Sequence, residues 1–415
     1  MTAPGLAAAG RAREVNWLGK AMGTADDAAL QRVVSILDGM RNRGDADAVL
    51  EQARKRLRVL RPPRPLGFAR LLFLPLDGAI VPSARWRRGE ALLPRGALAG
   101  LAAAVHQGLG SRAAPIFEAC EGRTTAETVA IRRIGATLWP AAPDALPQQP
   151  PADWATTGLA AADYPAVAAL CRPLWAQGAA LWEAVAAAAE GPPDGLVEAA
   201  LVGLLPAGPK PLAAALATLL ANASAPGRVA QVAARLDPLA RPVALQALDA
   251  MLDQPMPELD QLDIRSATEA SLALARRLDD LAQCSLLGVD RQRRVHTLRR
   301  AAEEACRGRF MAAAELQLLM PAMRLAVAEQ VQDAEVTAIE TGARELRGLE
   351  GAGRRLGGGQ AYDRALRAMG ETLTALATRA TQPDGLRPID LARMLEILAG
   401  PDAGAALLPR AATAA

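Results

Sequence analysis

AEVTAIETGARELRGLE, residues 334–350, carries the pattern that decides the fold. Its apolar positions recur at helical spacing: Val336, Ile339, Ala343, Leu346 and Leu349. Because an α-helix completes a turn every 3.6 residues, this spacing places all of them on one side of a helix. The stretch therefore predicts an amphipathic helix whose apolar stripe faces a core.

Similar stripes recur towards both ends of the chain, in Leu30–Met40, Ala46–Leu60, Leu274–Leu281, Tyr362–Leu376 and Ile389–Leu398. The last of these follows Pro388, a residue favoured at the first position of a helix. Pro321 interrupts the apolar stretch at 311–331, which predicts a kinked or split helix there. Helices are also expected at 97–109 and 124–138.

Between the two ends, residues 154–253 alternate alanine- and leucine-rich segments with proline-bearing turns. Segment 238–252 somewhat resembles one helix of a HEAT-type repeat, although no second copy aligns with it. Short helices separated by tight turns are typical of stacked helical pairs. The predicted fold class is therefore all-α, a multi-helix array of short antiparallel helix pairs that is solenoid-like or an irregular bundle.

One segment, at about 61–95, departs from this pattern because its six prolines forbid a long helix. It is predicted to be mainly non-helical, and its most apolar run, FARLLFLPL at 68–76, to be a short strand or an extended segment packed on the helices. The predicted division is an N-terminal helical region at 1–140, a Pro-rich linker at 141–153, helical pairs at 154–253, a helical bundle at 254–400 and a flexible tail at 401–415.

Composition argues against the commonest kinds of catalytic and metal chemistry. The 415 residues include two histidines and four cysteines, and the cysteines form no CxxC pair. General acid–base catalysis and zinc binding usually need these residue types in clusters. We therefore predict no metal, no cofactor and no catalytic residue. Few cysteines, no signal-peptide core and no membrane-length apolar stretch predict a cytoplasmic protein.

The two histidines and one glycine-rich stretch have structural interpretations. His106 is expected near the end of a helix and His296 among arginines on a basic helix. Gly351, Gly353 and Gly357 superficially resemble a dinucleotide-binding motif, but a charged helix and not a buried strand precedes them. These glycines are expected to end one helix and turn into the next.

A basic segment from Arg41 to Arg95 is the one functional lead in the composition. It holds thirteen Lys or Arg against five Asp or Glu, in a chain of net charge +3. Basic side chains beside an aromatic ring can hold phosphate and stack on a base. The candidate binding residues are Arg54, Arg56, Arg58, Arg61, Arg64, Arg85, Trp86, Arg87 and Arg88. Since arginine replaces lysine almost everywhere in the chain, as in proteins from GC-rich genomes, a solvated helix face is the favoured interpretation.

Three function classes follow from these patterns. The leading hypothesis is a non-catalytic helical scaffold or adaptor that binds a protein partner through a groove or concave face. The alternative is a nucleic-acid-binding protein that uses Arg54–Arg88. A second alternative is an enzyme whose site is assembled from distant residues, in which a histidine would lie beside a buried carboxylate. The sequence does not determine the oligomeric state.

Overall fold

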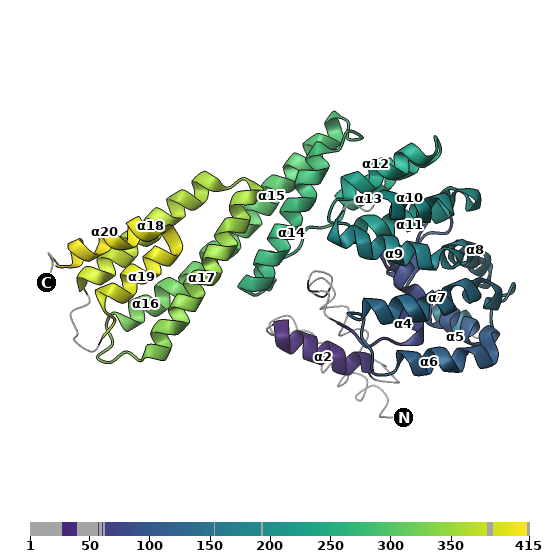
Figure 1. The fold of residues 1–415 in the computed structure, drawn as a ribbon, viewed down its shortest axis with the longest axis horizontal. Helices are drawn as coiled ribbons and strands as arrows, with labels where there is room; N and C mark the ends of the chain where they lie inside the picture. The colour runs from purple at the N-terminus through teal and green to yellow at the C-terminus, as the bar shows by residue number, and fades with distance from the viewer. Residues whose placement is uncertain are drawn as a thin grey trace, which may run out of the picture.

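The computed structural model describes residues 27–39, 57, 60, 63–152, 154–191, 194–379 and 385–412, and it confirms an all-α multi-helix array (Figure 1). Within these residues the strands are confined to one parallel pair, Ile80–Val81 with Leu93–Pro94. The helices are α2 (Asp27–Gly39), α4 (Phe68–Phe73), α5 (Ala97–Leu109), α6 (Ala113–Cys120), α7 (Thr128–Ala145), α8 (Tyr164–Ala176), α9 (Gly178–Glu190), α10 (Asp194–Val202), α11 (Pro209–Asn222), α12 (Pro226–Leu236), α13 (Ala240–Leu252), α14 (Ile264–Gln283), α15 (Val289–Ala314), α16 (Met320–Leu325), α17 (Asp333–Leu356), α18 (Gly359–Arg379), α19 (Pro388–Ala399) and α20 (Pro401–Ala412).

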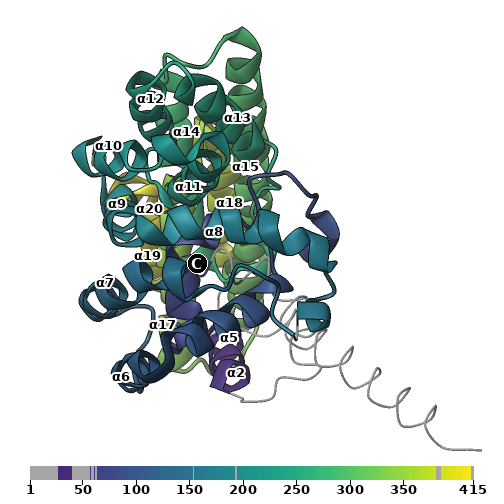
Figure 2. The same ribbon diagram turned by 90° about the vertical axis from the view of Figure 1, so that its right-hand side faces the viewer.

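Helices α7 to α14 stack in solenoid-like fashion. Most of them pack on the next helix but one: α7 contacts α9, α9 contacts α11 and α11 contacts α13, while α10 contacts α12 and α12 contacts α14. Helix α8 instead packs on α7, α9 and α11. Figure 2 shows the resulting tiers, from α6 and α7 at one end to α12 and α13 at the other. Alanine at many buried positions, such as Ala184, Ala215 and Ala244, lets neighbouring helices approach closely.

The segment at 68–76 forms neither a strand nor an extended chain, which corrects the sequence-based prediction. It is helix α4 followed by a 3₁₀ turn, Leu74–Ala79. The Trp139 indole N–H donates to the Leu71 carbonyl at 2.9 Å, and that of Trp175 to the Leu72 carbonyl at 3.0 Å. The last carbonyls of a helix lack the usual i+4 donors, and here two distant tryptophans donate to two of them, in addition to the Leu74 N–H that donates to the Leu71 carbonyl. The segment is helical because tertiary contacts complete a helix too short to be stable alone.

Two further boundaries differ from the sequence-based prediction. Helix α7 continues to Ala145, through Pro140 and Pro143, into the region expected to be a loop. The burial of Trp139 and Ala142 outweighs the two missing N–H donors there. Residues 401–412, expected to be a flexible tail, form helix α20, which packs on α18 and α19 and buries Leu407.

The C-terminal region consists of longer helices. In Figure 1, α14, α15 and α17 run side by side, with α18, α19 and α20 at the far end. The predicted interruption at Pro321 is confirmed, because a π turn, Glu315–Leu319, separates α15 from α16. Of the three glycines expected to end a helix, only Gly357 does so, in the left-handed conformation with φ +119°. Gly351 and Gly353 lie inside α17.

The two regions meet where α12 and α13 pack against α14 and α15. At this seam the Asp249 carboxylate accepts from Arg291 at 2.6 and 2.9 Å and from Arg294 at 2.8 Å. Asp27 of α2 accepts from the backbone N–H of Asp263 at 3.3 Å. One continuous cluster of buried residues, from Leu66 to Leu407, runs through both regions, so α4 to α20 share a single core.

Candidate protein-interaction surface

The structure places both histidines on the surface. His106 lies in the last turn of α5, with its ring edge against Phe68 and Phe117 at centroid distances of 5.9 and 5.1 Å. His296 is exposed on α15, and in the described chain it makes no ion pair with a carboxylate. No group of three or more His, Cys, Asp or Glu side chains in the described residues is arranged to hold a metal ion. Among the described residues, no ion pair joins either histidine to a carboxylate of the kind that orients a catalytic imidazole.

The most reactive residue types come together in the interior of the C-terminal region. Cys306, Tyr362 and Ser271 are fully buried there beside Glu303, and the hydroxyls of Tyr362 and Ser271 lack a well-formed hydrogen bond. Burial raises the pKa of the Cys306 thiol, although the two nearby hydroxyls oppose the shift. Burial also raises the pKa of the Tyr362 phenol, and the neighbouring Cys306 adds to the effect. These groups stay neutral at pH 7, which suppresses thiolate chemistry.

The candidate basic residues fall into two sets. Arg54, Arg56, Arg58 and Arg61 lie outside the described residues. Arg64, Arg85, Trp86, Arg87 and Arg88 lie within them.

In the described set, Trp86 is buried and its indole N–H donates to the Leu92 carbonyl at 3.0 Å. Arg88 donates to Asp163 at 2.6 Å, and Arg87 donates to the Ala84 and Trp86 carbonyls. The backbone N–H of Arg64 donates to the Thr125 hydroxyl at 3.0 Å. The ring that was expected to stack on a base therefore packs inside the protein.

A different surface shows an unusual apolar character. Five large apolar side chains on the end of α15, the π turn, α16 and the turn after it point into solvent. We call them the outer stripe: Met311 (47% exposed), Leu316 (64%), Met320 (54%), Met323 (53%) and Val327 (80%). Isolated exposed apolar residues are common, but a contiguous row of them marks interaction surfaces.

The outer stripe lies opposite the core side of the same helices. Leu318, Ala322 and Leu325 are buried in the bundle, and Leu316, Met320 and Met323 alternate with them along the sequence. Two apolar rows on opposite sides of one helix leave one row without a partner in the described chain. A surface helix that only stabilises its own fold needs a single apolar row.

The π turn at 315–319 shapes the outer stripe. In an uninterrupted α-helix Met311 and Met320, nine residues apart, would be two and a half turns apart and so on opposite sides. A π turn absorbs one extra residue and rotates the preceding helix, which brings Met311 towards the side of Met320. π turns of this kind are frequent at functional sites.

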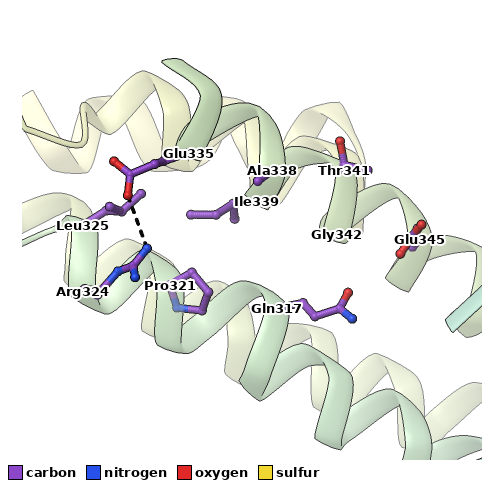
Figure 3. A pocket seen from close by; sticks show the side chains of 10 residues that line it. All are labelled: Gln317, Pro321, Arg324, Leu325, Glu335, Ala338, Ile339, Thr341, Gly342 and Glu345. Carbon is purple, nitrogen blue, oxygen red and sulfur yellow. Dashed lines mark hydrogen bonds and ion pairs between the residues drawn. The ribbon is translucent and has the colours of Figure 1, made fainter. Parts of the chain in front are cut away.

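A shallow groove of about 360 Å³ runs beside the outer stripe, between α16 and α17 (Figure 3). Its floor contains the buried Ile339 and Leu325, together with Gly342. Arg324 and Glu335 pair at one end at 3.4 Å, and Gln317 and Glu345 stand at the other. The groove is apolar at its base and polar at its ends, as in sites that receive an apolar side chain.

The sequence contained a signal for this surface that the helical analysis missed. Residues 311–327 hold two charged residues, Glu315 and Arg324, whereas the helices on either side are rich in charge. A surface helix with so little charge is either buried or partnered on more than one side.

Comparison of the chain with protein-family models, with curated proteins and with solved structures gave no match. No helix in the described part of the chain is long and apolar enough to cross a bilayer.

Proposed function

We propose that this protein is a non-catalytic helical scaffold that binds a protein partner through the outer stripe. The observation that carries the proposal is the row of five exposed apolar side chains, three of them methionines, on a helix whose opposite side is already packed in the core. Methionine is flexible and polarizable, and it recurs at protein surfaces that adapt to a partner. The proposal includes a cytoplasmic location, which the four free, buried cysteines fit.

The other hypotheses have weaker support. Nucleic-acid binding through the basic segment would have to work without the Trp86 ring, which is buried, and with Arg88 engaged by Asp163. Charge reversal of Arg56, Arg58, Arg87 and Arg88 tests it, since phosphate binding would weaken and lose its salt dependence. An enzyme that used Cys306 and Tyr362 would need access to side chains that are fully buried, and within the described residues no ion pair joins a histidine to a carboxylate.

The test of the proposal is purification of a tagged full-length chain from its own cells, with nuclease present, followed by mass spectrometry. The wild type is compared with the double variant Leu316→Asp/Met320→Asp. Val129→Asp is the matched control, because Val129 is 76% exposed on α7, away from the outer stripe. Thermal unfolding of each variant establishes that the fold is kept.

The expected result is a stoichiometric protein that accompanies the wild type and the control but not the double variant. Two aspartates in the centre of an apolar interface should weaken binding by at least about a hundredfold. Copurification that is equal for all three chains would contradict the proposal, as would the absence of any protein partner.

A further inference from the structure

We infer that the partner presents a basic amphipathic α-helix, which packs along the outer stripe and inserts one apolar side chain into the groove between α16 and α17. This inference rests on the proposed function and names the chemistry of the partner.

The spacing of the outer stripe argues for a helical partner. Leu316, Met320, Met323 and Val327 follow one another at intervals of four, three and four residues. This is the spacing of the apolar seam between two packed helices, where each side chain enters a gap between residues of the other helix. The helical part of the row, from Met311 to Met323, covers roughly 18 Å, the length of a helix of about three turns.

The groove lies where a helix on the outer stripe would reach it. Of the four residues of the π turn and α16 that line the groove, all but Leu325 directly follow a residue of the stripe: Gln317 follows Leu316, Pro321 follows Met320 and Arg324 follows Met323. Successive helix positions are rotated by about a quarter to a third of a turn. A helix on the stripe can therefore place a side chain over Ile339 and Gly342, at the base of the groove.

The charges around this surface argue for a basic partner. The Glu315 carboxylate beside the stripe and the Glu345 carboxylate at the end of the groove make no ion pair within the described residues. The one cation of the groove lining, Arg324, is paired with Glu335. The charge available to a partner is therefore negative, and it complements Lys or Arg on the polar face of a docked helix.

The same charges disfavour a second copy of this chain as the occupant. Packing of two outer stripes against each other would bring four unpaired carboxylates together, two from each copy, without a free cation from the groove. Like charges at an interface oppose association. A partner with the opposite charge meets no such penalty.

The experiment uses three fluorescein-labelled synthetic peptides of about 18 residues and the full-length chain. The first carries leucines at the four–three–four spacing with lysines between them. The second has the same leucines with glutamates in place of the lysines. The third is the lysine peptide with a central proline, which prevents a continuous helix. Binding is measured by fluorescence anisotropy, and helix formation by circular dichroism.

The expected result is saturable binding of the lysine peptide, with a gain of helicity, and at least about tenfold weaker binding of the other two. Met320→Asp should lower the affinity for the lysine peptide by about tenfold or more, and Val129→Asp should leave that affinity unchanged. The double variant Glu315→Lys/Glu345→Lys should bind the lysine peptide about three- to tenfold more weakly and the glutamate peptide more tightly.

If the lysine and glutamate peptides bind equally well, the inference that the partner segment is basic is wrong. If the proline peptide binds as well as the lysine peptide, the inference that the partner segment is helical is wrong. Self-association of the chain that Met320→Asp abolishes, seen by sedimentation, would assign the surface to a second copy instead. If the native partner of the purification depends on Leu316 and Met320 but the lysine peptide does not bind, this inference fails while the proposed function stands.

Discussion

The N-terminal and C-terminal regions of this protein reach the same all-α architecture by different means. In the N-terminal region, four tryptophans each donate an indole N–H to a backbone carbonyl. Trp86 and Trp154 fix nearby turns in this way, whereas Trp139 and Trp175 reach back to helix α4, far along the chain. Beyond Trp182 the chain contains two aromatic residues, Phe310 and Tyr362.

The C-terminal region relies instead on long helices joined by charged pairs. The Glu350 carboxylate, 2% exposed, pairs with Arg347 and Arg354. Glu340 pairs with Arg344 of its own helix and with Arg393 of α19, each at 2.9 Å. Short helices broken by prolines need large side chains to fix them in place. Long amphipathic helices have enough apolar area to pack with leucine and alanine alone.

The different packing of the two regions also explains why the exposed apolar row lies in the C-terminal region. Inside the N-terminal stack, helices have neighbours on both sides: α9 contacts α7 and α11, and α11 contacts α9 and α13. The end of α15 and α16 lie at the edge of the C-terminal bundle, where one side of the helix has no further tier to cover it (Figure 1).

The largest expected effect concerns the tryptophan anchors. Trp175→Phe should destabilise the protein by about 2–4 kcal/mol, because it leaves the buried Leu72 carbonyl without a donor and opens a cavity. Trp182→Phe is the matched control, because that indole is partly buried and donates no hydrogen bond to the described chain, so a loss below about 1.5 kcal/mol is expected. Urea unfolding measures the loss of stability in both variants. Equal losses would show that the indole hydrogen bond of Trp175 does not distinguish it from Trp182.

A second test sharpens the description of the C-terminal core. A β-carbon on Gly353 would collide with the Tyr362 ring and hydroxyl, whereas one on Gly351, two residues away in the same helix, meets no atom within 4 Å. Gly353→Ala should therefore destabilise by about 1–3 kcal/mol. Gly351→Ala should stabilise by about 0.5–1 kcal/mol, since alanine is the better helix former. Thermal unfolding distinguishes them, and a stabilising Gly353→Ala would refute the close contact of α17 with Tyr362.

The smallest expected effect tests the seam between the regions. The hydrogen bond from Arg291 lowers the pKa of Asp249, and Arg294 adds to it. A lowered pKa means that the pair stabilises the fold above the unfolded value, near 3.9, and that this contribution is lost as the pH falls through the lower folded value. Asp249→Asn should remove about 1 kcal/mol at pH 7, because solvent screens the half-exposed pair, and should flatten the acid limb of the stability curve.

Asp290→Asn serves as the control for the seam, because the Asp290 side chain is 93% exposed and its partner, Arg293, is 76% exposed. Urea unfolding between pH 3 and 7 should give the same curve for this variant as for the wild type. If Asp249→Asn also follows the wild-type curve, the charged seam contributes nothing to the contact between the regions.

Much of the fold was predictable from the sequence because apolar periodicity is a local signal. The stripe at 336–349 is buried as expected at Ile339, Leu346 and Leu349, and α19 begins at Pro388. The second predicted helix, at 46–60, lies outside the described residues apart from Leu57 and Leu60. Helix α4 and the continuation of α7 through two prolines were not predictable, because contacts with residues far along the chain stabilise them.

The proposed interaction surface was likewise predictable in part. Local signals predict a helix from about Met311 that Pro321 interrupts, since propensity and proline sterics act within a few residues, and in the structure this helix ends at Leu325. The packing of the folded chain sets which apolar row enters the core and which stays exposed. That choice depends on the rotation that the π turn introduces and on where α17 and α18 lie, and neither is encoded within the segment itself.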